Sequence, residues 1–114
     1  MFDSTTIRAL TSALDGLSER QRTIANNIAN VNTPGYHARR VSFESALAQS
    51  VAAHDGSVTA TTSISDDPTR TDGNNVNLDT ETLTNVETLL RYQLGTQAVN
   101  QQFQSVRSAL GSAS

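Results

Sequence analysis

The sequence predicts a mainly α-helical protein, whose N- and C-terminal helices pair as an antiparallel coiled coil, with a flexible or partly β middle segment. Two observations support this fold class. Apolar residues recur at helical spacing near both ends of the 114-residue chain, and the middle is rich in Ser, Thr, Asp, Gly and Asn. We therefore divide the chain into an N-terminal helix with its stop (1–36), a variable connector (37–77) and a C-terminal helix (78–114).

The first segment carries an apolar residue every three or four positions, with Gln21 filling one slot of the repeat. This heptad spacing predicts a helix over about residues 4–32. Pro34 cannot continue a helix and Gly35 tolerates a positive φ, so the helix should stop just before them. The predicted packing residues of this helix are Ile7, Leu10, Leu14, Leu17, Ile24, Ile28 and Val31.

The last segment predicts a second helix from about Asp79 to Leu110. Asp79 and Glu81 would lie in its first turn, where the helix dipole favours acidic groups, and Gly111 suits the C-cap. One seam of this helix contains Leu89, Tyr92, Thr96, Val99, Phe103, Val106 and Leu110, and the stripe is widened in the first half by Leu83, Val86, Leu90 and Leu94.

The middle segment carries turn signals at residues 55–56 and 72–75. Residues 46–53 could form one or two helical turns, and the weak alternation over 58–64 could form a short strand. Few large apolar side chains lie between, so we expect a short insertion within 52–65 to be tolerated.

Composition excludes several functional classes. The net charge is −3 and all eight basic residues are scattered arginines, whereas a nucleic-acid-binding protein needs a basic stripe. The chain has no cysteine, hence no disulfide or thiolate metal site, and its N-terminus does not resemble a cleaved signal peptide. Leu, Ile, Val and Phe make up only 25 of the 114 residues, so a partner is expected to complete the core.

No catalytic or metal-binding pattern emerges. His37 and His54 stand near no nucleophile motif, and we interpret both as surface residues. The acidic stretch 66–73 fails as a calcium loop, because Pro68 would occupy the first ligand position. We therefore expect neither an enzyme nor a protein with a cofactor, a metal or a small-molecule substrate.

Both predicted helices contain long stretches without charge, at residues 23–36 and 92–106. A helix with one face in water usually carries charged side chains there. Asn and Gln replace them here, and amides can be buried at lower cost when they are hydrogen-bonded. We favour burial between neighbouring subunits over the alternative, compositional drift on a solvated helix.

Residues 25–36, Ala-Asn-Asn-Ile-Ala-Asn-Val-Asn-Thr-Pro-Gly-Tyr, resemble the N-terminal signature of flagellar rod and hook proteins. Residues 39–44, 72–81 and 90–93 are similar to the proximal-rod members of that family, although His37 stands where Lys is common. The resemblance covers both ends and skips the middle. Its signature residues are Asn26, Asn27, Asn30, Asn32, Thr33, Pro34, Gly35 and Tyr36.

This resemblance implies a structural subunit of the proximal rod in the flagellar basal body, which polymerises by its terminal helices into the drive shaft and export channel. It implies export to the periplasmic rod without a cleaved signal. The implied partners in this homo- or hetero-oligomeric helical assembly are other rod subunits, the rod adaptor protein FliE, and components of the membrane ring and export gate.

Two other functions are open on sequence alone. One is a secreted coiled-coil regulatory or adhesive protein that uses a flagellar-type export N-terminus. The other is a small hydrolase, for which the sequence offers no nucleophile motif. Electron microscopy of purified basal bodies separates the rod subunit from the secreted protein, because only the former would lie in the axial structure.

Overall fold

The computed structural model describes residues 4–112, which form three helices and a two-stranded antiparallel sheet. The elements are α1 (Ser4–Ala29), β1 (Arg39–Ser42), α2 (Glu44–Ala52), β2 (Thr61–Ile64) and α3 (Leu78–Ser112). The mainly helical fold class is therefore confirmed. Residues 1–3 and 113–114, the outermost parts of the predicted end segments, lie outside the described residues.

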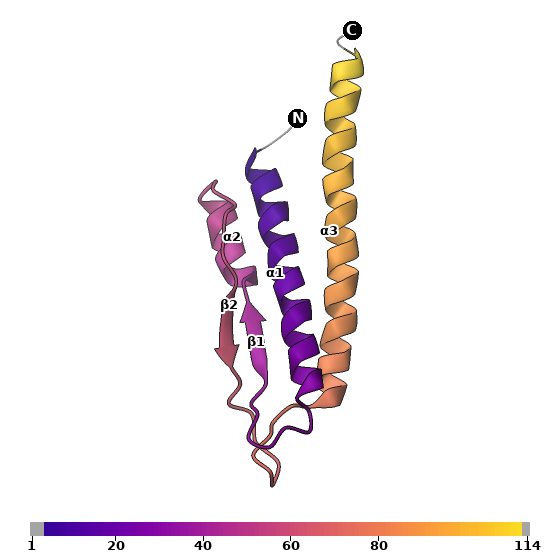
Figure 1. Ribbon diagram of the computed structural model, residues 1–114. Helices are drawn as coiled ribbons and strands as arrows, with labels where there is room; N and C mark the ends of the chain where they lie inside the picture. The colour runs from indigo at the N-terminus through magenta and orange to yellow at the C-terminus, as the bar shows by residue number, and fades with distance from the viewer. Residues whose placement is uncertain (1–3, 113–114) are drawn as a thin grey trace.

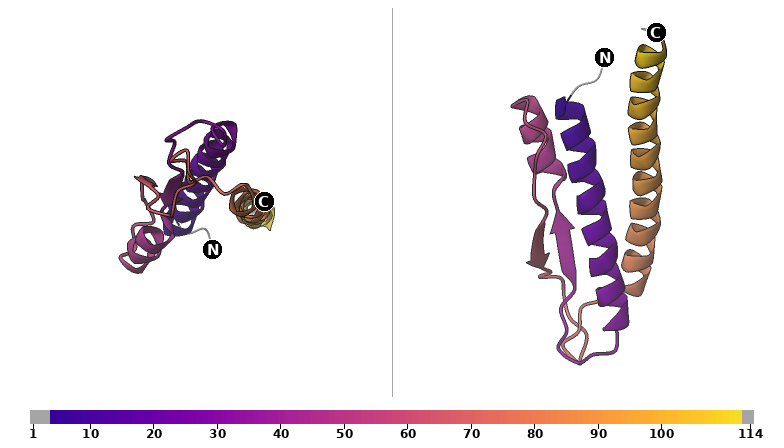
Figure 2. Two further views of the ribbon diagram at one scale, coloured as in Figure 1. Left: turned by 90° about the horizontal axis from the view of Figure 1, so that it is seen from below. Right: turned by 45° about the horizontal axis from the view of Figure 1, so that its top comes forward.

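The molecule is elongated, with extents of 68 × 25 × 14 Å. The long helices α1 and α3 lie side by side and run in opposite directions, and the segment from β1 to β2 lies on another side of α1 (Figure 1). Views from two further directions show the same order, with α1 between α3 and that segment (Figure 2). The last turns of α3 extend beyond the described start of α1 (Figure 1).

The middle segment is partly β, as expected. The strand anticipated within residues 58–64 is β2, and the anticipated helical turns are α2. Strand β2 pairs antiparallel with β1, with Val41 opposite Thr62. Strand β1 was not predicted, because its alternation of apolar and polar residues covers only four positions directly after the helix stop.

Helix α1 ends at Ala29, three residues before the predicted end at Asn32. After Ala29 the backbone hydrogen bonds change from i−4 to i−3 spacing. The amide of Asn30 is shared between the carbonyls of Asn26 and Asn27, and the amide of Val31 bonds to Ile28. Such shared and i−3 bonds close a helix end. Val31 therefore lies in the closing turn, and the expected positive φ occurs at Gly35 (φ 75°).

The hydrophobic core lies between α1 and the β1–α2 segment. Its centre is formed by Leu17, Val41 and Phe43, with half-buried Leu47 packed against them. The ring of Phe43 lies directly over Gly16, where a Cβ atom would approach it to 2.6 Å. Glycine weakens a helix interior by roughly 1 kcal/mol, but here it admits the aromatic ring.

The loop after α2 also lies against α1. A Cβ atom on Gly56 would lie 2.6 Å from the carbonyl oxygen of Thr5, and Gly56 has a φ of 83°. The hydroxyl of Ser12 donates to the Gly56 carbonyl at 3.0 Å, and that of Thr5 donates to the His54 carbonyl at 3.1 Å. This contact contradicts the premise that little packing depends on the length of residues 52–65.

Candidate functional site

Asn27, in the last turns of α1, is fully buried and binds the backbone of β1. Its Nδ2 donates to the carbonyl of Arg39 at 2.9 Å, and its Oδ1 accepts from the Arg39 amide at 3.0 Å. The same oxygen accepts from the hydroxyl of Tyr36 at 3.3 Å. The side-chain amide of Asn27 thus bonds to both the N–H and the C=O of Arg39, as a neighbouring strand would, and it attaches β1 to α1.

Asn74 connects the approach to α3 with the end of α1. It is fully buried, and its Nδ2 donates to the carbonyls of Asn30 at 2.8 Å and Thr33 at 2.9 Å. Its Oδ1 accepts from the amide of Val76 at 2.7 Å. Beside it, the amide of Gly35 donates to the Asp72 carbonyl at 2.8 Å. The two signature segments, far apart in sequence, therefore meet here.

Asn75 continues this arrangement toward the sheet. Its Oδ1 accepts from the amide of Ala38 at 2.6 Å, while its Nδ2 donates to the carbonyls of Ser65 and Asp67, both at 3.1 Å. Its own amide donates to the Tyr36 carbonyl at 3.2 Å. One buried side chain thus joins the chain before β1, the chain after β2 and the approach to α3.

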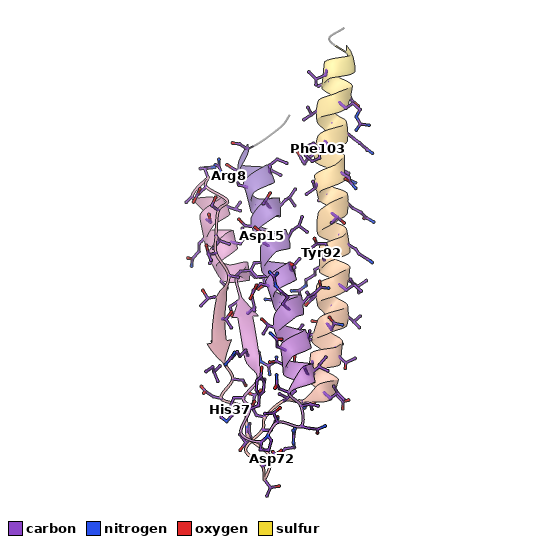
Figure 3. All side chains as sticks on the ribbon, viewed as in Figure 1. Arg8, Asp15, His37, Asp72, Tyr92 and Phe103 are labelled. Carbon is purple, nitrogen blue, oxygen red and sulfur yellow. The ribbon has the colours of Figure 1, made fainter. Side chains whose placement is uncertain are left out.

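We call Asn27, Asn74, Asn75 and their backbone partners the asparagine junction. It lies at the end of the molecule where the loops carrying His37 and Asp72 come together (Figure 3). The side-chain amides are used as both donors and acceptors on buried backbone groups, so the polar cluster costs little desolvation. Amides do not titrate, so we expect the bonds of the junction itself to be insensitive to pH.

The structure places the predicted signature residues unequally. Asn27 and Tyr36 belong to the junction, Asn30 and Thr33 contribute carbonyls to it, and Gly35 bonds beside it to the Asp72 carbonyl. The other signature residues, Asn26, Asn32 and Pro34, are exposed.

Glu44 links three helices. Both of its oxygens accept from Arg20 of α1, at 2.6 and 2.7 Å, and Arg91 of α3 lies 3.2 Å from it. The Arg20 guanidinium also donates to the Val41 carbonyl at 2.8 Å and lies over the Phe43 ring, 5.0 Å from its centroid. Hydrogen bonding from Arg20 lowers the pKa of Glu44 from 4.5 to about 2, against the opposing effect of burial.

Glu81, in the first turn of α3, is only 1% exposed, although acids of a first turn usually point to solvent. Its Oε1 accepts from Arg40 of β1 at 3.2 Å, and Arg40 also binds Asp67 at 3.0 Å. Within residues 4–112 the second oxygen, Oε2, has no hydrogen-bond partner. Glu81 therefore ties the first turn of α3 to the sheet, and its burial orients the helix.

The packing residues predicted in α1 all lie at least partly inside the subunit, although Val31 falls beyond the end of the helix. Leu17 and Ile24 are buried. The remaining members are half-buried: Ile7, Leu10, Leu14, Ile28 and Val31.

The packing residues predicted in α3 fall on different sides of the helix. Tyr92 points toward α1 (Figure 3), and Val99 and Val106 are half-buried as it is. Phe103 and Leu110 are exposed, as is Leu89. Leu83, Val86, Leu90 and Leu94 do not widen the α1-facing stripe.

We call Leu83, Val86, Leu90 and Leu94 the apolar ridge. Their exposed fractions are 61%, 50%, 60% and 67%. The α1-facing side instead carries Glu81 and Thr88, which are each 1% exposed. At about 3.6 residues per turn, Leu90 lies roughly 160° around the helix from Tyr92, so the ridge faces away from α1 at Leu90. Leu94 lies at the edge of the ridge, where it lines a groove together with Leu10 of α1. In a single copy, the most apolar side of α3 is therefore in solvent.

No three or more His, Asp or Glu side chains among the described residues are grouped so that they could hold a metal ion. None of the helices in residues 4–112 is both long and apolar enough to cross a membrane.

Comparisons with known proteins identify relatives of this chain. A family model described as flagella basal body rod protein matches residues 7–37. The chain is 30% identical over 121 residues to the flagellar basal body rod protein FlgB of Bacillus subtilis strain 168, with 94% of each chain covered. It is 29% identical over 126 residues to FlgB of Salmonella typhimurium strain LT2, with 91% of each chain covered.

These matches define a structural protein of the flagellar rod, a class that is not an enzyme family. The chain belongs to the FlgB family of flagellar basal body rod proteins. The match extends over both ends and the middle of the chain, beyond the N-terminal signature alone. It therefore favours the rod protein over a secreted regulatory or adhesive protein that shares only an export-type N-terminus.

Proposed function

We propose that this chain is a structural subunit of the proximal rod, and that it polymerises through its terminal helices into part of the drive shaft and export channel of the basal body. Membership of the FlgB family supports the proposal. The single observation that carries it is the apolar ridge, whose side chains are at least half exposed.

The energetics of the ridge favour assembly. Fully burying a Leu or Val side chain contributes about 1.5–3 kcal/mol, so covering each half-exposed ridge residue would gain roughly 1 kcal/mol. Four such residues in one stripe form a contiguous apolar surface, which monomeric proteins rarely leave uncovered. The stretch from residue 92 to 106, which includes the end of the ridge, carries no charge, so packing it against a neighbour would not require the burial of charged groups.

In the assembled rod, α1 and α3 would pair as an antiparallel coiled coil, with residues 1–36 and 78–114 as the packing segments and 37–77 as the outer connector. The subunit would reach the periplasmic rod by export without a cleaved signal. Its neighbours would be other rod subunits, the adaptor FliE, and components of the membrane ring and the export gate.

A pair of adjacent substitutions tests the proposal. Leu83→Asp places a charge on the ridge, whereas Thr82→Asp places the same charge one residue away at another exposed position. Each variant would replace the wild-type gene, with soft-agar motility and immunoblots of purified basal bodies as readouts. We expect Leu83→Asp to abolish motility and incorporation, and Thr82→Asp to retain both.

Circular dichroism of the two purified variants is the folding control, because both side chains are exposed in the single subunit. Absence of the wild-type chain from purified basal bodies would contradict the rod assignment itself. Normal motility with Leu83→Asp would show that the ridge is not a packing surface.

A further inference from the structure

A small cavity of about 50 Å³ lies where the second half of α1, strand β1 and the first turns of α3 meet. Each of these elements brings a polar residue to its wall. Helix α1 contributes Thr23, β1 contributes Arg40, and α3 contributes Glu81 and Thr84. A water molecule needs only about 10–15 Å³, whereas sites for organic ligands usually measure about 300–1,000 Å³, so the size of this cavity suits water.

Glu81, in the wall of this cavity, needs a further hydrogen-bond donor. It is 1% exposed, and its Oε1 accepts from Arg40. Within residues 4–112 no group donates to its Oε2. A buried carboxylate oxygen without a donor is costly, and native proteins nearly always satisfy such an atom with a protein group or an ordered water. A donor bound in the cavity would lie beside this carboxylate.

We propose that the cavity is a binding site for an ordered water molecule that joins α1 to α3. This water donates to Oε2 of Glu81 and to one of the two threonine hydroxyls, and it accepts from the other. Three partners are the usual number for a buried water, and a hydroxyl can both donate and accept. The site lies next to the Arg40–Glu81 ion pair, so the water and the ion pair together connect the start of α3 to α1 and the sheet.

The charges around the cavity favour a neutral ligand over an ion. Arg20, Arg39 and Arg40 all line it and would repel a cation, whereas Glu81 would repel an anion. The guanidinium groups of Arg20 and Arg40 are already bonded to carboxylates, which competes with any anion for their donors. Water, which carries no net charge and both donates and accepts, fits this wall.

The competing arrangement is a direct bond within α3. Thr84 lies three residues after Glu81, on the same face of the helix, so rotation of its side chain could bring its hydroxyl to Oε2. Thr23 takes no part in that arrangement, because it belongs to α1. The two arrangements therefore differ in whether the hydroxyls of Thr23 and Thr84 depend on each other.

A double-mutant cycle on the purified full chain tests this dependence. Thr23→Val and Thr84→Val each remove a hydroxyl and leave the shape of the side chain nearly unchanged. Thr82→Val is the matched control at an exposed position of α3. With a shared water, either single substitution should lower the folding equilibrium constant about fivefold relative to the control, as expected for one hydrogen bond, and adding the second should lower it by about twofold or less.

Effects of Thr23→Val and Thr84→Val that multiply would overturn the proposal, and so would a Thr23→Val effect no larger than that of Thr82→Val. Magnetic relaxation dispersion of the solvent water gives a second measurement, because it detects water molecules held inside a protein. We expect the wild-type chain to hold at least one more such molecule than the chain with both valine substitutions. An equal signal from the two chains would overturn the proposal.

A crystal structure of the wild-type chain locates the ligand. We expect a water oxygen within about 3 Å of Oε2 of Glu81 and of the hydroxyls of Thr23 and Thr84. A direct bond from Thr84 to Glu81 with no water between α1 and α3 would contradict the proposal, as would an ion in the cavity.

Discussion

Replacing Asn74 by alanine tests whether the asparagine junction holds the subunit together. The change removes two donated bonds, to the carbonyls of Asn30 and Thr33, and one accepted bond from the amide of Val76. Val76 is only 1% exposed, so its amide would lose its partner where water does not reach. That orphaned donor costs about 1–3 kcal/mol, and each bond to the more accessible carbonyls contributes about 0.5–1.5 kcal/mol.

The expected loss is therefore about 2–6 kcal/mol, a large part of the roughly 5–15 kcal/mol by which small domains are stable. At about 4–8 °C per kcal/mol for a domain near this size, the melting temperature should fall by at least about 8 °C. Thermal and urea unfolding followed by circular dichroism measure both quantities. Asn85→Ala is the control, because Asn85 is an exposed asparagine of α3. A melting temperature of Asn74→Ala within about 2 °C of the wild type would refute the reasoning.

Two further substitutions test the contacts along α1. Gly56→Ala should lower the unfolding free energy by more than about 1 kcal/mol, because the φ of 83° is strained for alanine and its Cβ would lie 2.6 Å from the Thr5 carbonyl. Gly111→Ala, where an added Cβ atom would meet nothing within 4 Å, should not lower the unfolding free energy in the same urea titration. Glu44→Gln should lower the unfolding free energy by up to about 1 kcal/mol near pH 6, because it removes the Arg20–Glu44 ion pair, in which Glu44 is about half exposed. Because folding lowers this pKa from 4.5 to about 2, that difference should vanish as the pH falls through this range, and a pH-independent difference would contradict it.

The two long helices were predictable because their signal is local. Apolar spacing and the Pro34–Gly35 stop act within a few turns of the chain, so the sequence indicated both helices to within a few residues. The end of α1 was misplaced at Asn32, because the chain turns after Asn30, whose carbonyl accepts from both the Thr33 amide and the Asn74 side chain. That contact joins residues 44 positions apart, and no local rule reveals it.

The junction itself was missed for the same reason. Asp72-Gly73-Asn74-Asn75 was interpreted as a turn signal, which accounts for the loop but not for the two buried asparagines within it. A run of two asparagines in a turn is common in exposed loops. Asn74 and Asn75 are buried because they bind backbone carbonyls and amides of other segments. Those segments come close to the two asparagines only in the folded chain.

The side of α3 that faces α1 was also beyond prediction, because its apolar residues lie all around its first half. The junction and Glu81 together explain the outcome. Asn74 and Asn75 hold the approach to α3, and the Arg40–Glu81 pair then holds the first turn with Glu81 inward. Turning the ridge toward α1 would separate Glu81 from Arg40 and break the contact that joins the first turn of α3 to the sheet. The rotation of α3 is thus set by polar contacts at its base, and those contacts leave Leu83, Val86, Leu90 and Leu94 directed outward, where a second subunit can cover them.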